Sequence, residues 1–220
     1  MPIVGYILTA VAAYLLGSIP TGFLVGKARG IDIRTVGSGN IGATNTFRAL
    51  GTPAGVFVLL ADVLKGWLAV GALAGLFARA FYPDADALAK EWFRVVAGVC
   101  AILGHNYTCW LWFKGGKGIA TSAGVLVALV PYPLLVILGV WLIVFALSHY
   151  VSLASICASV TLPFATWVLV KTPLLVYVTA GMAALAVYKH KANIQRLLNG
   201  TETRIVFKKA RATNAPTQSS

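Results

Sequence analysis

Long blocks of apolar residues alternate with short polar segments along this chain. A bilayer span requires about 20 apolar residues, or somewhat fewer when flanking groups reach the interface. The blocks that approach this length cover residues 3–26, 53–79, 92–112, 116–131, 133–149, 152–170 and 174–191. Because a backbone in lipid must satisfy its own hydrogen bonds and no barrel-like alternation is visible, we expect helices. The pattern predicts an all-α, polytopic integral membrane protein with seven spans.

Two block boundaries have alternative interpretations. The fourth and fifth blocks are divided by Pro131 and Pro133, which disfavour helix at that point. A six-span protein, with 116–149 as one bent unit, is the alternative. The first block could instead be a signal peptide, but it lacks a basic segment before it. We therefore expect a retained first span with its N-terminus outside.

Composition and charge agree with this topology. The chain of 220 residues is 59% hydrophobic and only 11% charged, whereas soluble domains carry about 25% charged residues. With an outside N-terminus and a cytosolic C-terminus, the inside segments hold 13 Lys and Arg residues and the outside holds four. This bias accounts for the net charge of +12 through topology and anionic headgroups. We expect contact with membrane lipid and no nucleic-acid partner.

The remaining composition defines one domain. Cys100, Cys109 and Cys157 lie in or near apolar blocks, without a CxxC pair or paired histidines at metal spacing. We expect no disulfide, no metal site and no cofactor. Residues 1–205 are predicted to form a single membrane-embedded domain that acts as a monomer. The polar residues 206–220 are predicted to be a disordered tail.

The first polar motif is VGSGNIGATNTFRALG, residues 36–51. Its glycines permit positive φ and close approach of backbone N–H groups to an anion. Thr44 and Asn45 suit the N-cap of a short helix, Arg48 can share their face, and Gly51 can end it. These features favour a phosphate site, although the stretch lacks the Walker ending. An ordinary connection rich in Gly and Asn is an equal alternative.

The second motif is FKGGKG, residues 113–118, between the third and fourth blocks. Lys114 and Lys117 flank a glycine pair and can point at one anion. A positive-inside hairpin explains the lysines but leaves the three glycines unexplained. His105, about two turns earlier, is more often a packing residue than a catalyst.

The third motif is YKHKANIQRLLNGTE, residues 188–202. His190, Asn193 and Arg196 are spaced by three, so they would share one broad face of a continuing helix, with Glu202 within reach. The alternative is an amphipathic interfacial helix, which explains the cations but not the His, Asn and Glu.

A charged pair lies within the second block. Asp62 and Lys65 are three residues apart, and isolated charges at this depth are costly. We expect them to face the bundle interior and to pair, a structural role that we favour over catalysis.

These motifs together resemble one known family. GSIPTGFL at 17–24, GSGNIGATN at 37–45, DVLKG at 62–66, GHNY through FKGGKGIAT at 104–121 and the 190–202 pattern resemble bacterial acyl-phosphate:glycerol-3-phosphate acyltransferase, the PlsY family. The resemblance implies a seven-helix enzyme of the bacterial inner membrane with a cytosolic site. It would move a fatty acyl group from acyl phosphate to the sn-1 hydroxyl of glycerol 3-phosphate, releasing lysophosphatidate and phosphate. This is the first step of bacterial phospholipid synthesis, and the donor would be neither acyl-CoA nor acyl carrier protein.

The histidines agree with an unusual donor. Other glycerolipid acyltransferases use His-x4-Asp, but here the fifth residue after each histidine is Trp110, Ala154 or Gln195. Acyl phosphate has a good leaving group, so the enzyme mainly has to bring two anions together and stabilise developing charge.

We expect a two-anion pocket built from all three motifs. The expected catalytic residues are Ser38, Arg48, Lys114 and His190. The expected substrate-binding residues are Gly39, Asn40, Gly42, Thr44, Asn45, Gly115, Gly116, Lys117, Asn193, Arg196 and Glu202. The attacking hydroxyl can give its proton to His190 or to a substrate phosphate, and we favour the phosphate. A transporter for an anionic phosphorylated metabolite is the main alternative function.

Overall fold

The computed structural model describes residues 2–205, and the tail predicted at 206–220 lies outside that range. The described chain contains the helices α1 (Pro2–Ser18), α2 (Thr21–Ala28), α3 (Ala43–Leu50), α4 (Thr52–Leu68), α5 (Ala74–Phe81), α6 (Ala87–Asn106), α7 (Ile119–Leu129), α8 (Pro131–Ser148), α9 (Val151–Leu169), α10 (Pro173–Lys189) and α11 (Lys191–Leu198). A π-helical segment, η2 (Ala69–Leu73), joins α4 to α5. Short 3-10 turns lie at η1 (Ile33–Thr35) and η3 (Cys109–Leu111). The predicted all-α class is confirmed for these residues.

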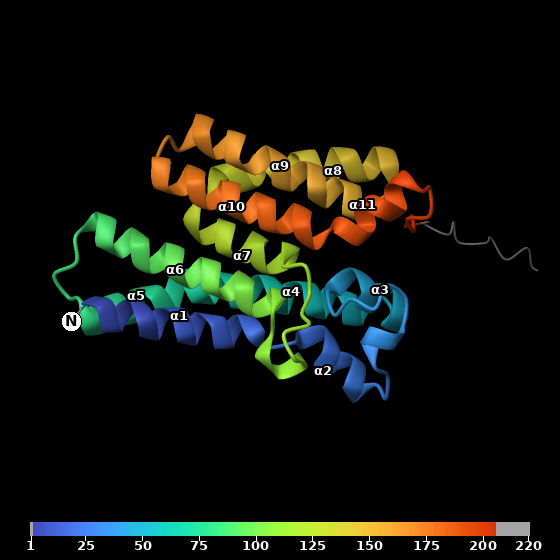
Figure 1. Ribbon diagram of the computed structural model, residues 1–220, viewed down its shortest axis with the longest axis horizontal. Helices are drawn as coiled ribbons and strands as arrows, with labels where there is room; N and C mark the ends of the chain where they lie inside the picture. Colours follow the sequence, from blue (N-terminus) through green and yellow to red (C-terminus); the bar gives the residue numbers. More distant parts are fainter. Residues whose placement is uncertain (1, 206–220) are drawn as a thin grey trace, which may run out of the picture.

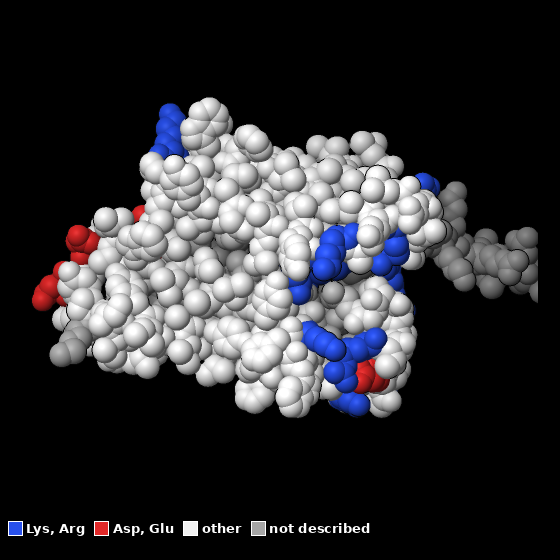
Figure 2. Space-filling model, in the orientation of Figure 1, with Lys and Arg blue, Asp and Glu red and all other residues white. Residues whose placement is uncertain are grey.

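The long helices run side by side along one axis (Figure 1). In the bundle α1 packs against α6, α4 packs against α7, and α9 lies between α8 and α10. The short helices α2, α3 and α11 gather at the end opposite the N-terminus (Figure 1). Figure 2 shows most of the visible Lys and Arg side chains at that end, with an acidic side chain among them, and the other visible acidic side chains at the opposite end. We call the end formed by α2, α3, α11 and residues 107–118 the basic end.

Four helical stretches are long and apolar enough to cross a membrane. They are Pro2–Ala28, Thr52–Phe81, Pro131–Ser148 and Val151–Leu169. Helices α7 and α10 are apolar but shorter. Helix α6 has 20 residues, but Lys90, Glu91 and Arg94 in its first half reduce its apolar character. The described chain is therefore a helical membrane protein with at least four candidate spans.

Helix boundaries differ from the predicted blocks where capping and proline chemistry intervene. The first block is broken after Ser18, before Pro20. Helix α6 begins earlier than predicted because the Asp86 carboxylate caps it, accepting the Ala89 N–H at 2.7 Å. Val130, with φ −143° and ψ 70°, separates α7 from α8, so 116–149 is not one helix.

Small residues bring the helices close enough to fix the frame of the site. A methyl group on Gly17 of α1 would overlap the Ala101 carbonyl of α6, and one on Gly104 would overlap the Tyr14 carbonyl. Without a hydrophobic force between helices in lipid, such close contact provides the packing energy. A larger apolar cluster joins η2 and α6 to α10, with Val125, Leu162 and other buried residues at its centre. The basic end is thus held on a tightly packed bundle.

Candidate active site

The first motif forms a loop whose shape is fixed by Asn45. Its Oδ1 accepts the Ser38 N–H at 2.9 Å, and its Nδ2 donates to the carbonyls of Ile33 and Val36, each at 3.0 Å. Gly37 and Gly39 adopt φ of 59° and 68°, values that glycine accepts without strain. The loop is therefore held in one shape by a side chain that was predicted to bind substrate.

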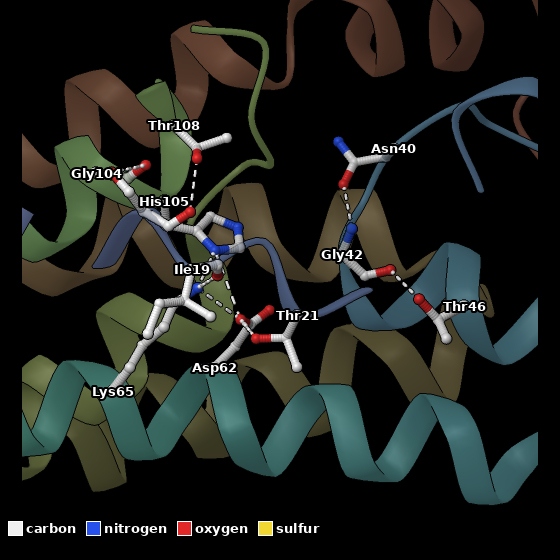
Figure 3. Close-up of polar contacts among 11 residues, drawn as sticks. Ile19, Thr21, Asn40, Gly42, Thr46, Asp62, Lys65, Gly104, His105 and Thr108 are labelled. Atoms are coloured by element: carbon white, nitrogen blue, oxygen red, sulfur yellow. Dashed lines mark hydrogen bonds and ion pairs between the residues drawn. The ribbon is translucent and has the colours of Figure 1, made fainter. Parts of the chain in front are cut away.

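This arrangement corrects two predictions about α3. Its N-cap is Gly42, rather than Thr44 or Asn45, which both lie inside the helix. The Gly42 N–H donates to Asn40 Oδ1 at 2.8 Å, and the Thr46 hydroxyl donates to the Gly42 carbonyl at 3.2 Å (Figure 3). Asn45 is only 2% exposed and its carboxamide forms hydrogen bonds with backbone groups, so it positions the loop, and it also lines the large cavity described below.

Arg48 extends from α3 towards the C-terminal segment. Its Nη2 donates to the Thr203 carbonyl at 3.1 Å. Gly51, at φ 85°, ends α3 as predicted. The short helix α3 therefore directs the Arg48 guanidinium towards the residues that follow α11.

The second motif, residues 113–118, forms a loop that we call the glycine-rich loop. Its two lysines lie in different surroundings. Lys117 Nζ donates to Asn193 Oδ1 at 2.5 Å. Burial lowers the pKa of Lys117 to about 8, with Arg196 and Arg48 adding to the effect and Glu202 opposing it. Lys114 is exposed to solvent instead and lines neither cavity described below. The expectation that both lysines converge is corrected: only Lys117 faces the site.

The third motif is organised by a carboxylate. Glu202 Oε1 accepts hydrogen bonds from Ser152 Oγ and Asn193 Nδ2, and its Oε2 accepts one from Arg196 Nε, all at 2.7 Å. Burial raises the pKa of Glu202, but these hydrogen bonds outweigh it and leave the pKa below its ordinary value. The carboxylate thus orients an amide and a guanidinium that could contact substrate.

His190 sits at a break between two helices. It ends α10 and caps α11, with φ −97°, so the predicted continuing helix is wrong. Its Nδ1–H donates to the Ala186 carbonyl at 2.7 Å, which leaves Nε2 as an acceptor. Burial, and then the charge of Lys117, lowers the pKa of His190 to about 4. His190 is therefore neutral at pH 7, a hydrogen-bond acceptor and a weak base.

One large cavity of about 600 Å³ joins these groups to an apolar groove. Its polar part is lined by Ser38, Arg48, Lys117, His190, Asn193 and Arg196. Its apolar part is lined by residues of α4, α7, α8, α9 and α10, among them Leu59, Leu126, Ile137, Trp141, Leu162 and Met182. Asn40, Gly42, Thr44, Asn45 and Glu202 also line the large cavity, whereas Gly39 lines neither cavity.

A smaller cavity of about 210 Å³ adjoins the polar part. Gly115, Gly116 and Lys117 of the glycine-rich loop face Asn193 and Arg196 across it. Lys189 also lines it and donates from Nζ to the Asn106 carbonyl at 2.9 Å. Sequence reasoning missed Lys189 as a site residue, because a lysine at the inside end of a span is expected from topology alone. The two cavities share Ser38, Asn40, Lys117, Asn193 and Arg196.

The arrangement suits two anions, one of which carries a long apolar chain. The polar region holds the cations Arg48, Lys117 and Arg196, which are suited to phosphate groups. Within residues 2–205 no three His, Cys, Asp or Glu side chains come together as metal ligands. Fold and site together define a helical membrane protein with a cationic, amphiphilic binding cavity.

Known proteins identify the family within this class. Residues 7–200 match the sequence profile of the family described as glycerol-3-phosphate acyltransferase. A glycerol-3-phosphate acyltransferase of Geotalea daltonii is 46% identical over 203 residues, covering 92% of this chain and 98% of that protein. A glycerol-3-phosphate acyltransferase of Geobacter sulfurreducens is also 46% identical, and the match covers 90% of this chain and 96% of that protein. The chain belongs to the glycerol-3-phosphate acyltransferase family.

Solved structures agree with that assignment. A crystal structure described as PlsY, an integral membrane glycerol 3-phosphate acyltransferase, in its glycerol 3-phosphate form matches with a TM-score of 0.80 and 39% identity. The match covers 91% of this chain and 96% of the PlsY chain. The lysophosphatidic acid form of PlsY matches with a TM-score of 0.78 and 38% identity. The predicted family is confirmed, and the transporter alternative is not favoured.

Proposed function

We propose that this chain transfers a fatty acyl group from acyl phosphate to the sn-1 hydroxyl of glycerol 3-phosphate. The observation that carries the proposal is a single cavity in which the cations Arg48, Lys117 and Arg196 meet an apolar groove. An acyl phosphate has the same two parts, an anionic head and an alkyl chain. The second anion, glycerol 3-phosphate, is the substrate in the names of the relatives and of the PlsY structure.

The reaction balances without a further reactant. The sn-1 hydroxyl oxygen attacks the acyl carbonyl carbon, and the bond between that carbon and the phosphate oxygen breaks. The hydroxyl proton passes to a phosphate oxygen, and the products are 1-acyl-glycerol 3-phosphate and inorganic phosphate. The low pKa of His190, about 4, supports a phosphate oxygen as the acceptor, because a good base has a pKa near the working pH.

The site residues divide into two roles in this proposal. Arg48 and Ser38 hold one phosphate, while Lys117 and the backbone of the glycine-rich loop hold the other. His190 accepts a hydrogen bond from glycerol 3-phosphate through Nε2, and Asn193 and Arg196, oriented by Glu202, complete that subsite. Fixed cations at both phosphates offset the repulsion between two anions and stabilise charge on the leaving group.

We also propose seven spans in a bacterial inner membrane, with the basic end in the cytosol. The four long apolar stretches, the shorter α7 and α10, and α6 with 20 residues make up that number. At 1.5 Å per residue, α6 is about 30 Å long, which matches the hydrocarbon core. The concentration of Lys and Arg at the basic end (Figure 2) supports its cytosolic location. We also propose that the protein acts as a monomer.

A donor experiment tests the proposed function. The purified protein is given glycerol 3-phosphate with either palmitoyl phosphate or palmitoyl-CoA, and lysophosphatidate and phosphate are measured. We expect product from palmitoyl phosphate alone. Product from palmitoyl-CoA alone contradicts the donor assignment. No product from either donor, combined with counterflow of glycerol 3-phosphate in vesicles, contradicts transfer and favours transport.

A further inference from the structure

A buried polar cluster of Asp62, Lys65 and His105 lies at the wall of the large cavity, which Asp62 and His105 line, but it has no part in the proposed reaction. Lys65 Nζ lies 2.7 Å from Asp62 Oδ1, 2.9 Å from His105 Nδ1 and 2.9 Å from the Ile19 carbonyl (Figure 3). The side chains of Lys65 and Asp62 are 5% and 2% exposed. The predicted ion pair of Asp62 and Lys65 is confirmed, and His105 is the third member of the cluster.

The cluster fixes the state of the imidazole. An ammonium group has three donors and no acceptor. The three donors of Lys65 meet three acceptors: Asp62 Oδ1, His105 Nδ1 and the Ile19 carbonyl. Nδ1 of His105 must therefore carry its lone pair, and the ring proton is on Nε2. Asp62 also accepts from the Thr21 hydroxyl at 3.3 Å. Groups from α4 therefore hold the ring at Nδ1. The segment after α1 supports those groups through the Ile19 carbonyl and the Thr21 hydroxyl.

The opposite edge of the same ring supports the glycine-rich loop. A methyl group on Gly116 would overlap His105 Nε2, and one on Gly115 would overlap the His105 carbonyl. The Gly116 N–H donates to that carbonyl at 3.0 Å. The loop therefore lies in contact with the imidazole, and its two glycines are required by this closeness. Lys117 follows directly and reaches Asn193.

We propose that Asp62 and Lys65, acting through His105, position the glycine-rich loop and with it the Lys117 ammonium. They are positioning residues, because the hydrogen bonds and the ion pair of Asp62 and Lys65 are made with protein groups. Any shift of the ring is transmitted to Gly116 by contact and to Lys117 by one peptide bond. A misplacement of about 1 Å in such a group costs about a hundredfold in rate. The role of Lys117 as a substrate cation rests on the proposed function.

The contact between His105 and Gly116 supplies the main test, a double-mutant cycle on the full-length protein in detergent. Gly116→Ala adds a methyl that collides with the ring, and we expect kcat/KM to fall about a hundredfold. His105→Ala removes the ring and lowers kcat/KM by itself. In the double variant the methyl meets free space, so we expect no loss beyond that of His105→Ala. Losses that multiply, as for independent sites, overturn the proposal.

A conservative pair of variants separates positioning from chemistry by the ring, and it serves if His105→Ala does not fold. The amide oxygen of His105→Asn can still accept a hydrogen bond from Lys65, whereas His105→Leu cannot. We expect His105→Asn to retain at least about tenfold more kcat/KM than His105→Leu, on the scale of one hydrogen bond to a charged group. Equal losses in the two variants overturn the positioning role.

Two controls make the outcome specific. Gly139→Ala on α8 meets no atom within 4 Å, and we expect its activity to match that of the parent. Binding of glycerol 3-phosphate is measured by calorimetry on every variant, which keeps this test separate from the choice of acyl donor. Weaker binding in Gly116→Ala, with binding in the double variant equal to that in His105→Ala, supports positioning even if acyl phosphate proves not to be the donor. Unchanged binding in Gly116→Ala overturns it.

Discussion

Lys117 Nζ donates to Asn193 Oδ1 over 2.5 Å, and this contact joins the glycine-rich loop to α11. Asn193 in turn donates to Glu202, which also accepts from Ser152 of α9. Two segments whose contact residues lie 76 positions apart in the chain therefore form one wall of the site. The cation is buried enough for its pKa to fall to about 8, so its charge is sensitive to pH near the physiological range.

The lowered pKa of Lys117 predicts a loss of substrate affinity at alkaline pH. Anion binding requires the ammonium form, so KM for the anion held by Lys117 should increase as pH rises above about 8. The limiting slope is about tenfold per pH unit, as for a single proton. The measurement is the KM of each substrate at a series of pH values from about 6.5 to about 9.5. This range includes the titration midpoint of Lys117.

Lys117→Arg provides the control for this pH effect, because guanidinium stays charged throughout the range. We expect a flat KM profile at reduced kcat. The same alkaline loss in Lys117→Arg would assign the titration to another group. Stability has the opposite trend: the folded pKa of about 8 lies below the ordinary 10.5. The unfolded chain binds more protons between these values, so this group makes the fold more stable as pH rises through that window.

Arg48→Ala should abolish most activity without unfolding the protein. The guanidinium is aimed into the cavity from α3 and makes one hydrogen bond, to the Thr203 carbonyl. Removing a fixed charge that stabilises a developing anion costs about a hundredfold in kcat/KM. Steady-state kinetics and a melting curve are compared with those of Arg29→Ala, an exposed arginine at the same end. A large drop in melting temperature for Arg48→Ala alone would assign it a structural role.

Lys114→Ala tests the separation of the two lysines. Lys114 is exposed and lines neither cavity, whereas Lys117 lines both. We expect Lys114→Ala to retain activity within about threefold, in line with a surface charge, and Lys117→Ala to lose most of it. Comparable losses in the two variants would restore the sequence-based expectation that both lysines act on one anion.

His190→Ala should leave weak activity and mainly raise KM for glycerol 3-phosphate. The ring is neutral, with a pKa of about 4, and presents Nε2 as an acceptor because Nδ1–H is bonded to Ala186. It is thus better suited to orienting a hydroxyl than to taking its proton. Initial rates at varied glycerol 3-phosphate separate the effects. Abolished turnover with unchanged KM would identify His190 as the base.

Glu202→Gln should weaken the substrate site and the fold together. The carboxylate accepts hydrogen bonds from Ser152, Asn193 and Arg196, and the amide removes the charge that holds the guanidinium. Hydrogen bonds to charged groups contribute about 1.5–3 kcal/mol each, so a lower melting temperature and a higher KM should appear together. Ser152→Ala, which removes one of the three donors, should have a smaller effect on both quantities.

The sequence indicated the site's parts better than their relative positions. Glycines and cations in local motifs marked the three segments, because the need for positive φ at Gly37 and Gly39 and for charge at Arg48 is local. The separation of Lys114 from Lys117 depended on Trp112 and Phe113, which adopt φ of 54° and 60° against the preference of aromatic residues. No periodicity predicts that turn.

Tertiary contacts decided the remaining differences. Asn45 has the chemistry of a ligand-binding residue, yet the backbone of residues 33–38 uses its carboxamide. His105 was expected to be a packing residue, and only the contacts with Lys65 and Gly116 show what it packs. Helix α10 ends at His190 although the following residues are themselves helical. Each outcome depends on partners that are distant in sequence, which composition and spacing do not reveal.

The segment after α11 has a consequence for the order of biosynthesis. Glu202 gathers Ser152, Asn193 and Arg196, Thr203 meets Arg48, and the Ile205 N–H donates to the His149 carbonyl at 3.0 Å. In the described chain, every helix precedes these residues in the order of synthesis. A nascent chain whose helices have all left the ribosome therefore still lacks one wall of its site. That wall is completed only when residues 202–205 follow.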